Sequence, residues 1–298
     1  MWPFSVLMLA PALLVATGLA YRARVTRTIE REYARRFPLD ANGIAEGAHE
    51  FTLHGNTGKA LLLLHGSGDS PQSLRYLGEQ LNATGYTVYA PLLPGHGRSP
   101  RAFAMATAND YHSEVRRALA QLRQSHEWIG LVGLSMGGAL AAYAAREAAD
   151  VRLLVLIAPY LVPPPQVRWA QRVSPLWRWA VPYLRGRGEG SVHDVNARDE
   201  SRAYGSFSAA ALTALVDTAD AGRDALSALT LPTLVVNSET DNRIPRASAE
   251  AALRVFRVPV ESHWVRGCGH VVTVDYCKAR VAELVLAFLA RHAGVLPA

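Results

Sequence analysis

The stretch that decides the fold is IGLVGLSMGG, residues 129–138. Its opening residues are a short apolar run typical of a buried strand, and the alanine-rich segment after residue 136 has helical spacing. Between them, Gly133, Ser135 and Gly137 form the pattern G-x-S-x-G in a strand–turn–helix context. Larger side chains at the glycine positions would collide with the neighbouring strand and helix. The pattern therefore predicts a sharp turn that exposes the Ser135 hydroxyl at a helix amino terminus, where developing negative charge is favoured.

The rest of the chain repeats this alternation of strand and helix. Continuous apolar strands separated by helices are typical of a parallel sheet covered on both faces. We therefore expect an α/β fold with a mostly parallel, doubly wound sheet, and a site beyond the carboxyl ends of its strands. The apolar runs are, in chain order, Ala60–Leu64, Tyr86–Ala90, Ile129–Val132, Leu153–Ile157, Thr233–Val236 and Val258–Val265.

One segment, at about residues 160–228, breaks the alternation. An insert of this length is too long for a connection and too short for an independent core. We interpret it as a small helical cap over the site, with Trp169, Trp177 and Trp179 as candidate substrate-binding residues. A peripheral decoration that touches no substrate, with tryptophans that only pack it onto the core, is the alternative.

The amino-terminal residues 1–21, MWPFSVLMLAPALLVATGLAY, carry no charged side chain. As a helix they would reach roughly 30 Å, the thickness of a bilayer core. Residues 22–36 hold six arginines and two glutamates. The flank of a membrane-spanning helix that carries more positive charge usually stays in the cytoplasm. We expect a single-pass anchor in the inner (cytoplasmic) membrane at 1–21, a basic juxtamembrane helix and linker at 22–48, and a cytoplasmic globular domain at 49–298.

Two alternatives to that anchor stay open. A cleaved signal peptide would place the globular domain in the periplasm or outside the cell, although no basic residue precedes the apolar run. A buried helix of a soluble protein is the other. The arginines of residues 22–36 could also contact anionic lipid headgroups.

Composition excludes several classes of protein. Half of the residues are hydrophobic and 19% are charged, which excludes a disordered chain. The net charge of +6 is concentrated in residues 22–36, so we predict no nucleic-acid partner. Two cysteines, Cys268 and Cys277, exclude a disulfide-rich scaffold and a thiolate-rich zinc site but leave the redox compartment open. No cluster has metal-ligand spacing, so we predict no metal and no cofactor.

A serine hydroxyl needs a neighbouring base before it can act as a nucleophile. In a strand–turn–helix site of this kind, the acid and then the histidine follow the serine along the chain. Asp241 lies past the run Thr233–Val236, and Glu239 is the rival carboxylate, nearer to the strand. His270, which follows Gly269 in a loop past the final strand, is the candidate base.

Acyl transfer also requires N–H donors for the oxyanion that forms in its transition state. We expect one donor to be the amide of Met136, the residue after the serine. The other is expected in the glycine-rich turn after Ala60–Leu64, at the amide of Ser67, with His65 as a structural residue that orients the turn. The turn at residues 94–99 is interpreted as a loop that shapes the site.

Taken together, these motifs resemble the α/β-hydrolase superfamily over roughly residues 50–292. Within it, the chain is similar to bacterial carboxylesterases and monoacylglycerol lipases with a small cap. The resemblance implies a catalytic triad of Ser135, Asp241 and His270. Ser67 departs from the pattern, since such esterases often have a bulky aromatic residue there. The motifs are His65-Gly66, Pro94-Gly95-His96-Gly97, Gly133–Gly137, Asp241 and Gly269-His270.

The resemblance implies a serine hydrolase that cleaves a small-molecule or lipid carboxylic ester through an acyl-enzyme on Ser135. The membrane anchor is expected from residues 1–21 alone and has no counterpart in the soluble members of the family, so their substrates need not carry over. A thioesterase, amidase or acyltransferase would use the same triad, and a non-catalytic hydrolase-like binding protein is a further alternative. Because each buried methylene adds about 0.8 kcal/mol of binding, we expect medium-chain esters or monoacylglycerols to be cleaved better than acetate esters.

Overall fold

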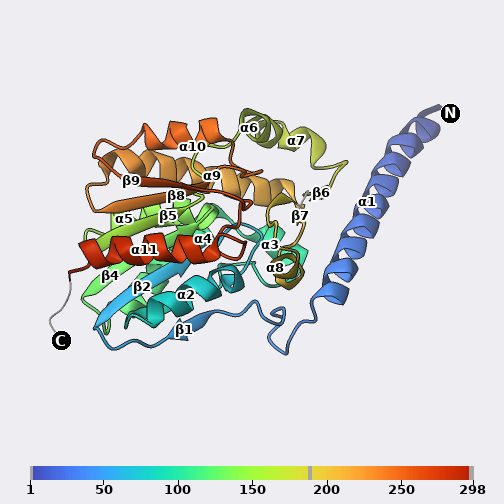
Figure 1. The fold of residues 1–298 in the computed structure, drawn as a ribbon. Coiled ribbons are helices and arrows are strands. Elements are labelled where there is room, and N and C mark those ends of the chain that lie inside the picture. The colour runs from blue at the N-terminus through green and yellow to red at the C-terminus, as the bar shows by residue number, and fades with distance from the viewer. Residues whose placement is uncertain (1–2, 187–189, 295–298) are drawn as a thin grey trace.

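A single sheet organises the computed structural model, which describes residues 3–186 and 190–294 (Figure 1). Within the described residues the sheet has seven strands, in the order β1-β3-β2-β4-β5-β8-β9. β1 is antiparallel to β3, and the other neighbouring strands are parallel, which confirms the predicted α/β class. The strands are β1 (Phe51–Leu53), β2 (Lys59–Leu64), β3 (Thr87–Ala90), β4 (Trp128–Leu134), β5 (Val151–Ile157), β8 (Thr233–Ser238) and β9 (Glu261–Val265).

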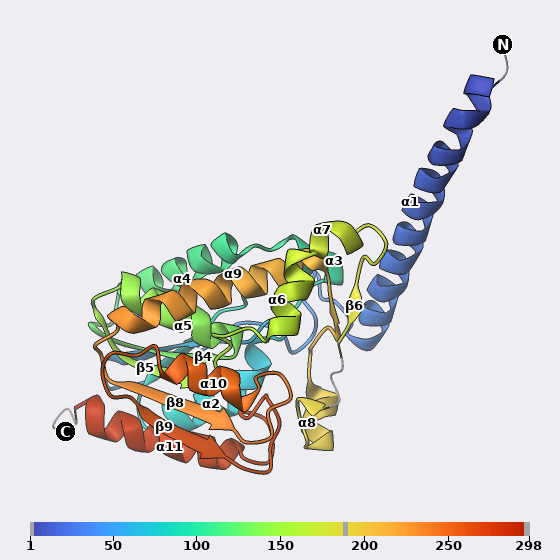
Figure 2. The same ribbon diagram turned by 90° about the horizontal axis from the view of Figure 1, so that it is seen from above.

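β2 shows why the strands are continuously apolar. Successive side chains of a strand point to opposite faces of the sheet. Leu61 and Leu63 belong to the core cluster on one face, and Leu62 and Leu64 to the cluster on the other; all four are fully buried. Figure 2 shows helices on both sides of the sheet. They include α2 (Arg75–Asn82) and α11 (Lys278–His292) on the first face, and α4 (Ala108–Leu122), α5 (Met136–Glu147) and α9 (Ala209–Ala225) on the second.

The segment between β5 and β8 is only partly a cap. Its long helix α9 packs against α5 so closely that a Cβ atom on Gly222 would lie 2.8 Å from the Cβ atom of Ala139. α9 therefore belongs to the helical layer of the body, and the residues before it form the covering part. Residues 187–189 of the predicted insert lie outside the described residues. The other elements here are α6 (Pro165–Arg172), α7 (Ser174–Trp177), β6 (Leu184–Arg185), α8 (Val195–Glu200), β7 (Ser206–Phe207) and η3 (Leu226–Ala228).

The amino-terminal helix α1 runs without interruption from Pro3 to Arg36, and its first half extends away from the body (Figures 1 and 2). It continues through the arginine-rich residues, where a helix was predicted. Within residues 3–186 and 190–294, no helix combines the length and the apolar composition that crossing a membrane requires. The anchor predicted for residues 1–21 is therefore not supported. Residues 1 and 2 lie outside the described part of the chain.

The second half of α1 is fastened to the body. The Tyr33 ring stacks on Tyr204, with 4.7 Å between ring centroids, and Glu32 forms an ion pair with Arg185. The carboxylate of Glu30 accepts a hydrogen bond from the backbone N–H of Arg101. The helix ends before Pro38, whose fixed φ and missing N–H oppose helix continuation. The remaining elements are η1 (Pro71–Leu74), α3 (Pro100–Met105) and α10 (Arg246–Leu253).

Candidate active site

Ser135 lies at the turn between β4 and α5, where the sequence places it. Its φ of 55° is in the left-handed region, which residues with a side chain rarely adopt. The Ser135 N–H donates to the Ile157 carbonyl at 2.9 Å, which holds the turn against β5. A Cβ atom on Gly137 would lie 2.0 Å from the Leu64 carbonyl oxygen, so only glycine lets α5 approach β2 this closely. The turn presents the serine at the carboxyl ends of the central strands.

Asp241 follows β8 and turns its carboxylate inward. One oxygen accepts the backbone N–H groups of Arg243 (2.7 Å) and Ile244 (2.8 Å), and the other lies 2.7 Å from Nδ1 of His270. The side chain is only 4% exposed. Burial alone would raise the pKa of this carboxyl, but the neighbouring His270 and the two backbone donors outweigh burial and lower it. Asp241 is therefore held as a carboxylate.

Glu239, the rival carboxylate, lies elsewhere. Its Oε2 atom forms an ion pair with Nε of Arg266 at 2.9 Å. The Arg266 side chain is 83% exposed, so the pair lies at the surface. The structure therefore brings Asp241, and not Glu239, to the histidine.

His270 connects the acid to the serine. Its Nδ1–H donates to Asp241, and its Nε2 lies 2.8 Å from the Ser135 Oγ. Donation from Nδ1 leaves Nε2 of the neutral ring without a proton, so Nε2 accepts the serine hydroxyl proton. The side chain of His270 is 9% exposed. The three side chains form one hydrogen-bonded series that can move a proton off the serine.

Two buried histidines fix the loops around Ser135. His65 Nδ1 donates to the Gly66 carbonyl at 2.9 Å, and its Nε2 accepts the Leu93 N–H at 3.1 Å. His96 Nδ1 donates to the Pro94 carbonyl at 3.0 Å, and its Nε2 accepts the Gly68 N–H at 3.0 Å. These bonds use the neutral form of each ring. Burial lowers the pKa of His96 to about 4, and burial together with the nearby His96 lowers that of His65 well below its usual value.

The predicted oxyanion donors flank the serine. Met136 is the first residue of α5, directly after Ser135. A Cβ atom on Gly66 would lie 3.3 Å from the Ser135 Cβ atom, so the turn after β2 passes close beside the nucleophile. Ser67, the next residue, lines the same cavity as Ser135. The structure thus brings Ser67 and Met136 next to Ser135.

A cavity of about 520 Å³ opens above Ser135 and His270. This is within the usual volume range of small-molecule sites. Its apolar wall comes from the insert and from the loop after His270. A slender acyl chain could lie along that wall with its carbonyl at Ser135. The apolar lining residues include Val167, Phe207, Leu212, Leu215, Val271 and Val274.

The three cap tryptophans do not line this cavity, so the structure does not support their predicted role in substrate binding. Trp169 and Trp179 are 67% and 63% exposed, because α6 and the turn after α7 leave their rings at the surface. The Trp177 indole N–H donates to the Ala170 carbonyl at 2.9 Å. The aromatic content of the cap was therefore a poor guide to which residues face the substrate.

Asp69 is a cavity residue that the sequence analysis missed. Burial raises the pKa of its carboxyl to about 6, against the opposing effects of Ser73, Ser70 and His270. Its position, two residues after Ser67 in the turn that follows β2, was the available signal. An acidic group therefore lies in the wall beside the candidate oxyanion donors.

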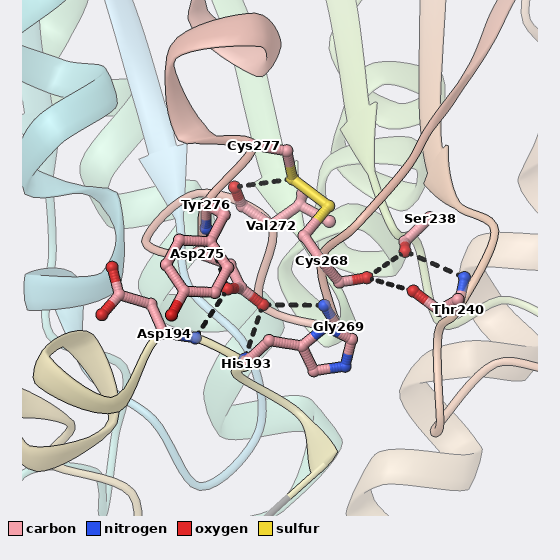
Figure 3. The surroundings of a disulfide bond; sticks show 10 residues. All are labelled: His193, Asp194, Ser238, Thr240, Cys268, Gly269, Val272, Asp275, Tyr276 and Cys277. Atoms are coloured by element: carbon pink, nitrogen blue, oxygen red, sulfur yellow. Dashed lines mark hydrogen bonds between the residues drawn. A yellow bond between two sulfur atoms is a disulfide. The ribbon is translucent and has the colours of Figure 1, made fainter.

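A disulfide bond that was not predicted joins Cys268 and Cys277 (Figure 3). The two cysteines lie on either side of His270 in the sequence. Within the same loop lies Asp275, which is fully buried. The signal was present in the spacing of the two cysteines around the candidate base. Spacing alone, however, does not show that two thiols meet.

The sheet, the turn at Ser135 and the Ser135–His270–Asp241 series define an α/β-hydrolase. More narrowly, the chain belongs to the hydrolase family described as serine aminopeptidase, S33, which matches residues 55–276.

Several characterised proteins are similar to this chain. A thermostable monoacylglycerol lipase of Bacillus sp. (strain H-257) is 29% identical over 84% of this chain and 98% of its own length. A carboxylesterase of Bacillus subtilis (strain 168) is 27% identical over 80% and 95%. Among solved structures, one described as a metagenome-derived lipolytic enzyme has a TM-score of 0.76 at 28% identity, covering 84% of this chain and 100% of that one.

Proposed function

We propose that the protein is a serine hydrolase that cleaves carboxylic esters through an acyl-enzyme on Ser135. The observation that carries this is the series from Ser135 Oγ to His270 Nε2 at 2.8 Å and from His270 Nδ1 to Asp241 at 2.7 Å. The names of the similar proteins, a monoacylglycerol lipase and a carboxylesterase, support ester cleavage.

The reaction begins when His270 takes the proton of the Ser135 hydroxyl and the oxygen attacks the ester carbonyl. Asp241 holds the imidazole in the tautomer that accepts this proton and stabilises the imidazolium that forms. His270 then gives the proton to the leaving alcohol. Water enters, loses a proton to His270 and releases the acid from Ser135 by the same steps in reverse order.

The backbone N–H groups of Ser67 and Met136 are proposed to bind the oxyanion of both tetrahedral intermediates. Met136 contributes from the amino terminus of α5, where the helix dipole adds to the stabilisation of negative charge. The turn that holds Ser67 is braced by the bonds of His65 and His96, so the donor is in place before substrate arrives.

The cavity supports a proposal for the substrate class. Its apolar side, which includes Leu212 and Leu215 of α9, is proposed to hold the acyl chain. Each methylene buried there adds about 0.8 kcal/mol of binding, so cleavage should improve with chain length until the cavity is full. Medium-chain esters and monoacylglycerols are therefore the proposed substrates, ahead of acetate esters.

Amide cleavage is a second candidate, because the family description names an aminopeptidase. The same triad would serve, but His270 would have to protonate an amine leaving group. Matched substrates separate the two functions. A p-nitrophenyl ester and a p-nitroanilide with the same acyl group would be compared by kcat/KM, and the ester is expected to be the better substrate.

The test of the proposed function is a panel of p-nitrophenyl esters from acetate to dodecanoate, with a monoacylglycerol and a thioester added. The wild-type protein is expected to cleave the medium-chain esters best. Ser135→Ala serves as the control for hydrolysis that does not use this site. Thioester cleavage well above ester cleavage, or equal hydrolysis by Ser135→Ala, would contradict the proposal.

A further inference from the structure

The two cysteines of the chain form a disulfide bond around the catalytic loop (Figure 3). Cys268 comes two residues before His270, and Cys277 directly precedes α11. Cys268 is fully buried and Cys277 is 8% exposed. Because α11 is anchored in the core by buried residues such as Val281 and Phe288, the disulfide ties the beginning of the histidine loop to a fixed helix.

Hydrogen bonds to Asp275 hold the other end of the loop. Its carboxylate accepts the backbone N–H groups of Gly269 (2.7 Å) and Tyr276 (2.8 Å) within the loop. It also accepts those of His193 (2.8 Å) and Asp194 (2.9 Å), which belong to the insert. One buried carboxylate therefore joins the histidine loop to the covering segment.

The Cys268 residue also meets the acid loop. Its carbonyl accepts hydrogen bonds from the hydroxyl groups of Ser238 and Thr240, and Thr240 directly precedes Asp241. The backbone on the amino-terminal side of His270 is thus fixed relative to the carboxylate that orients the ring. The disulfide is the covalent part of this arrangement, and the remaining parts are hydrogen bonds that can open.

We propose that the Cys268–Cys277 disulfide positions His270 for proton transfer, and that the enzyme therefore matures and works in an oxidising compartment. The positioning role rests on the proposed function of His270. A catalytic group displaced by about 1 Å can cost on the order of 100-fold in rate, so a loop that opens more often lowers turnover. Disulfides persist in oxidising compartments and are rare where thiols are kept reduced.

The disulfide bond forms by thiol–disulfide exchange with an oxidant that itself carries a disulfide. The two cysteine thiols lose two protons and two electrons in forming the new S–S bond, and the oxidant's disulfide takes them up to become two thiols. This placement differs from the cytoplasmic location expected from the arginines of residues 22–36. It agrees with the alternative in which the globular domain is periplasmic or outside the cell.

The oxidation state in cells tests the compartment. The full chain is expressed in a bacterium, quenched with acid, denatured, and treated with a maleimide–polyethylene glycol reagent with and without prior reduction. We expect no adducts before reduction and two after it, and the Cys268→Ala/Cys277→Ala variant should give none in either sample. Two adducts on the unreduced chain would overturn the inference.

Kinetics test the positioning role. The oxidised and the fully reduced wild-type proteins are compared on p-nitrophenyl butyrate, with active sites counted by fluorophosphonate titration and helix content by circular dichroism. Reduction is expected to lower kcat by about 10-fold with KM changed by less than about 2-fold. The Cys268→Ala/Cys277→Ala variant should not respond to the reductant, and if it does not fold, the reduced wild type alone decides.

The positioning role of the disulfide and the proposed ester hydrolase function are contradicted by different results. Equal kcat for oxidised and reduced protein would overturn the positioning role and leave the ester hydrolase in place. A loss of activity that matches a loss of helix content by circular dichroism would also overturn it, because that result shows unfolding. No ester hydrolysis by the oxidised protein would overturn the proposed function itself.

Discussion

At Ser135 a strained backbone places one hydroxyl group at the cavity. A φ of 55° in a residue with a side chain costs on the order of 1–3 kcal/mol. Hydrogen bonds to Ile157 and from Tyr160 hold it there, at 2.9 and 3.0 Å. Ala158, which directly follows Ile157, is the other described non-glycine residue with a positive φ (39°). The strain therefore lies at the proposed nucleophile and directly beside it, which supports this turn as the functional one.

Removing any member of the triad should remove most of the turnover. Ser135→Ala and His270→Ala are each expected to lower kcat on the order of 10⁴-fold or more, because the three side chains act as a unit. Asp241→Asn should be comparably damaging, since it favours the wrong tautomer of His270. Steady-state kinetics on a p-nitrophenyl ester measure all three.

Glu239→Gln is the matched control for Asp241→Asn. Glu239 pairs with Arg266 at the surface, so its loss should change kcat by less than about 2-fold. If Glu239→Gln were the severe variant and Asp241→Asn the mild one, the assignment of the acid would be wrong.

Asp69 should make stability depend on pH. Its pKa is raised to about 6, above an unfolded value near 4, so the native state binds more protons between these values. Stability contributed by this group is therefore lost as pH rises from about 4 to 6. Urea unfolding at pH 4.5 and 7.5 should show Asp69→Asn gaining up to about 2 kcal/mol over wild type at the higher pH. Asp199→Asn, a change at an exposed carboxyl, is the control and should show no such gain. No gain for Asp69→Asn would contradict the prediction, because it would show that the Asp69 carboxyl is solvated.

The loops after β2 and β3 form a pair, joined by two neutral histidines. Because the pKa of His96 falls to about 4, the unfolded chain binds a proton below about pH 6.5 that the native state does not. The contribution of His96 to the free energy of unfolding is fully present above that pH. It is lost as pH falls toward 4, by up to about 3 kcal/mol. Unfolding measured across this range should depend less on pH in His96→Gln than in wild type. An identical pH dependence of unfolding in wild type and His96→Gln would contradict this account. His54→Gln, a change at the surface, is the control variant.

Helix α9 should set the acyl-chain preference. Leu215 lines the cavity and is half-buried, so Leu215→Trp fills space that an acyl chain would occupy. We expect kcat/KM on p-nitrophenyl octanoate to fall about 10-fold, the loss of nearly two buried methylenes, with the acetate ester changed by less than about 2-fold. Trp169→Ala, on the exposed face of α6, is the control and should leave both unchanged. Equal loss on both esters would place the acyl chain elsewhere.

Across the whole molecule, the sheet was predictable because a strand buried on both faces must be apolar throughout, as Leu61–Leu64 are. The three-residue strand β1 was missed, since it is too short to show a pattern. The serine, acid and histidine were predictable because each lies just past a strand and the parallel sheet brings those ends together.

Features that depend on contacts between distant segments were not predictable. Trp169 and Trp179 of the cap face outward, which composition does not reveal. The meeting of Cys268 and Cys277 depends on how the loop folds back onto α11. The helix over the arginine-rich residues, by contrast, was predicted, and α1 confirms it by running to Arg36.

The central claim is that Ser135 is the nucleophile of an ester hydrolase. It is tested most directly by identifying the residue that a fluorophosphonate modifies, using peptide mass spectrometry on the full chain. We predict one adduct per chain, on Ser135, with ester hydrolysis lost in proportion to labelling and neither labelling nor hydrolysis in Ser135→Ala. An adduct on another residue, or ester hydrolysis that persists in Ser135→Ala, would contradict the claim.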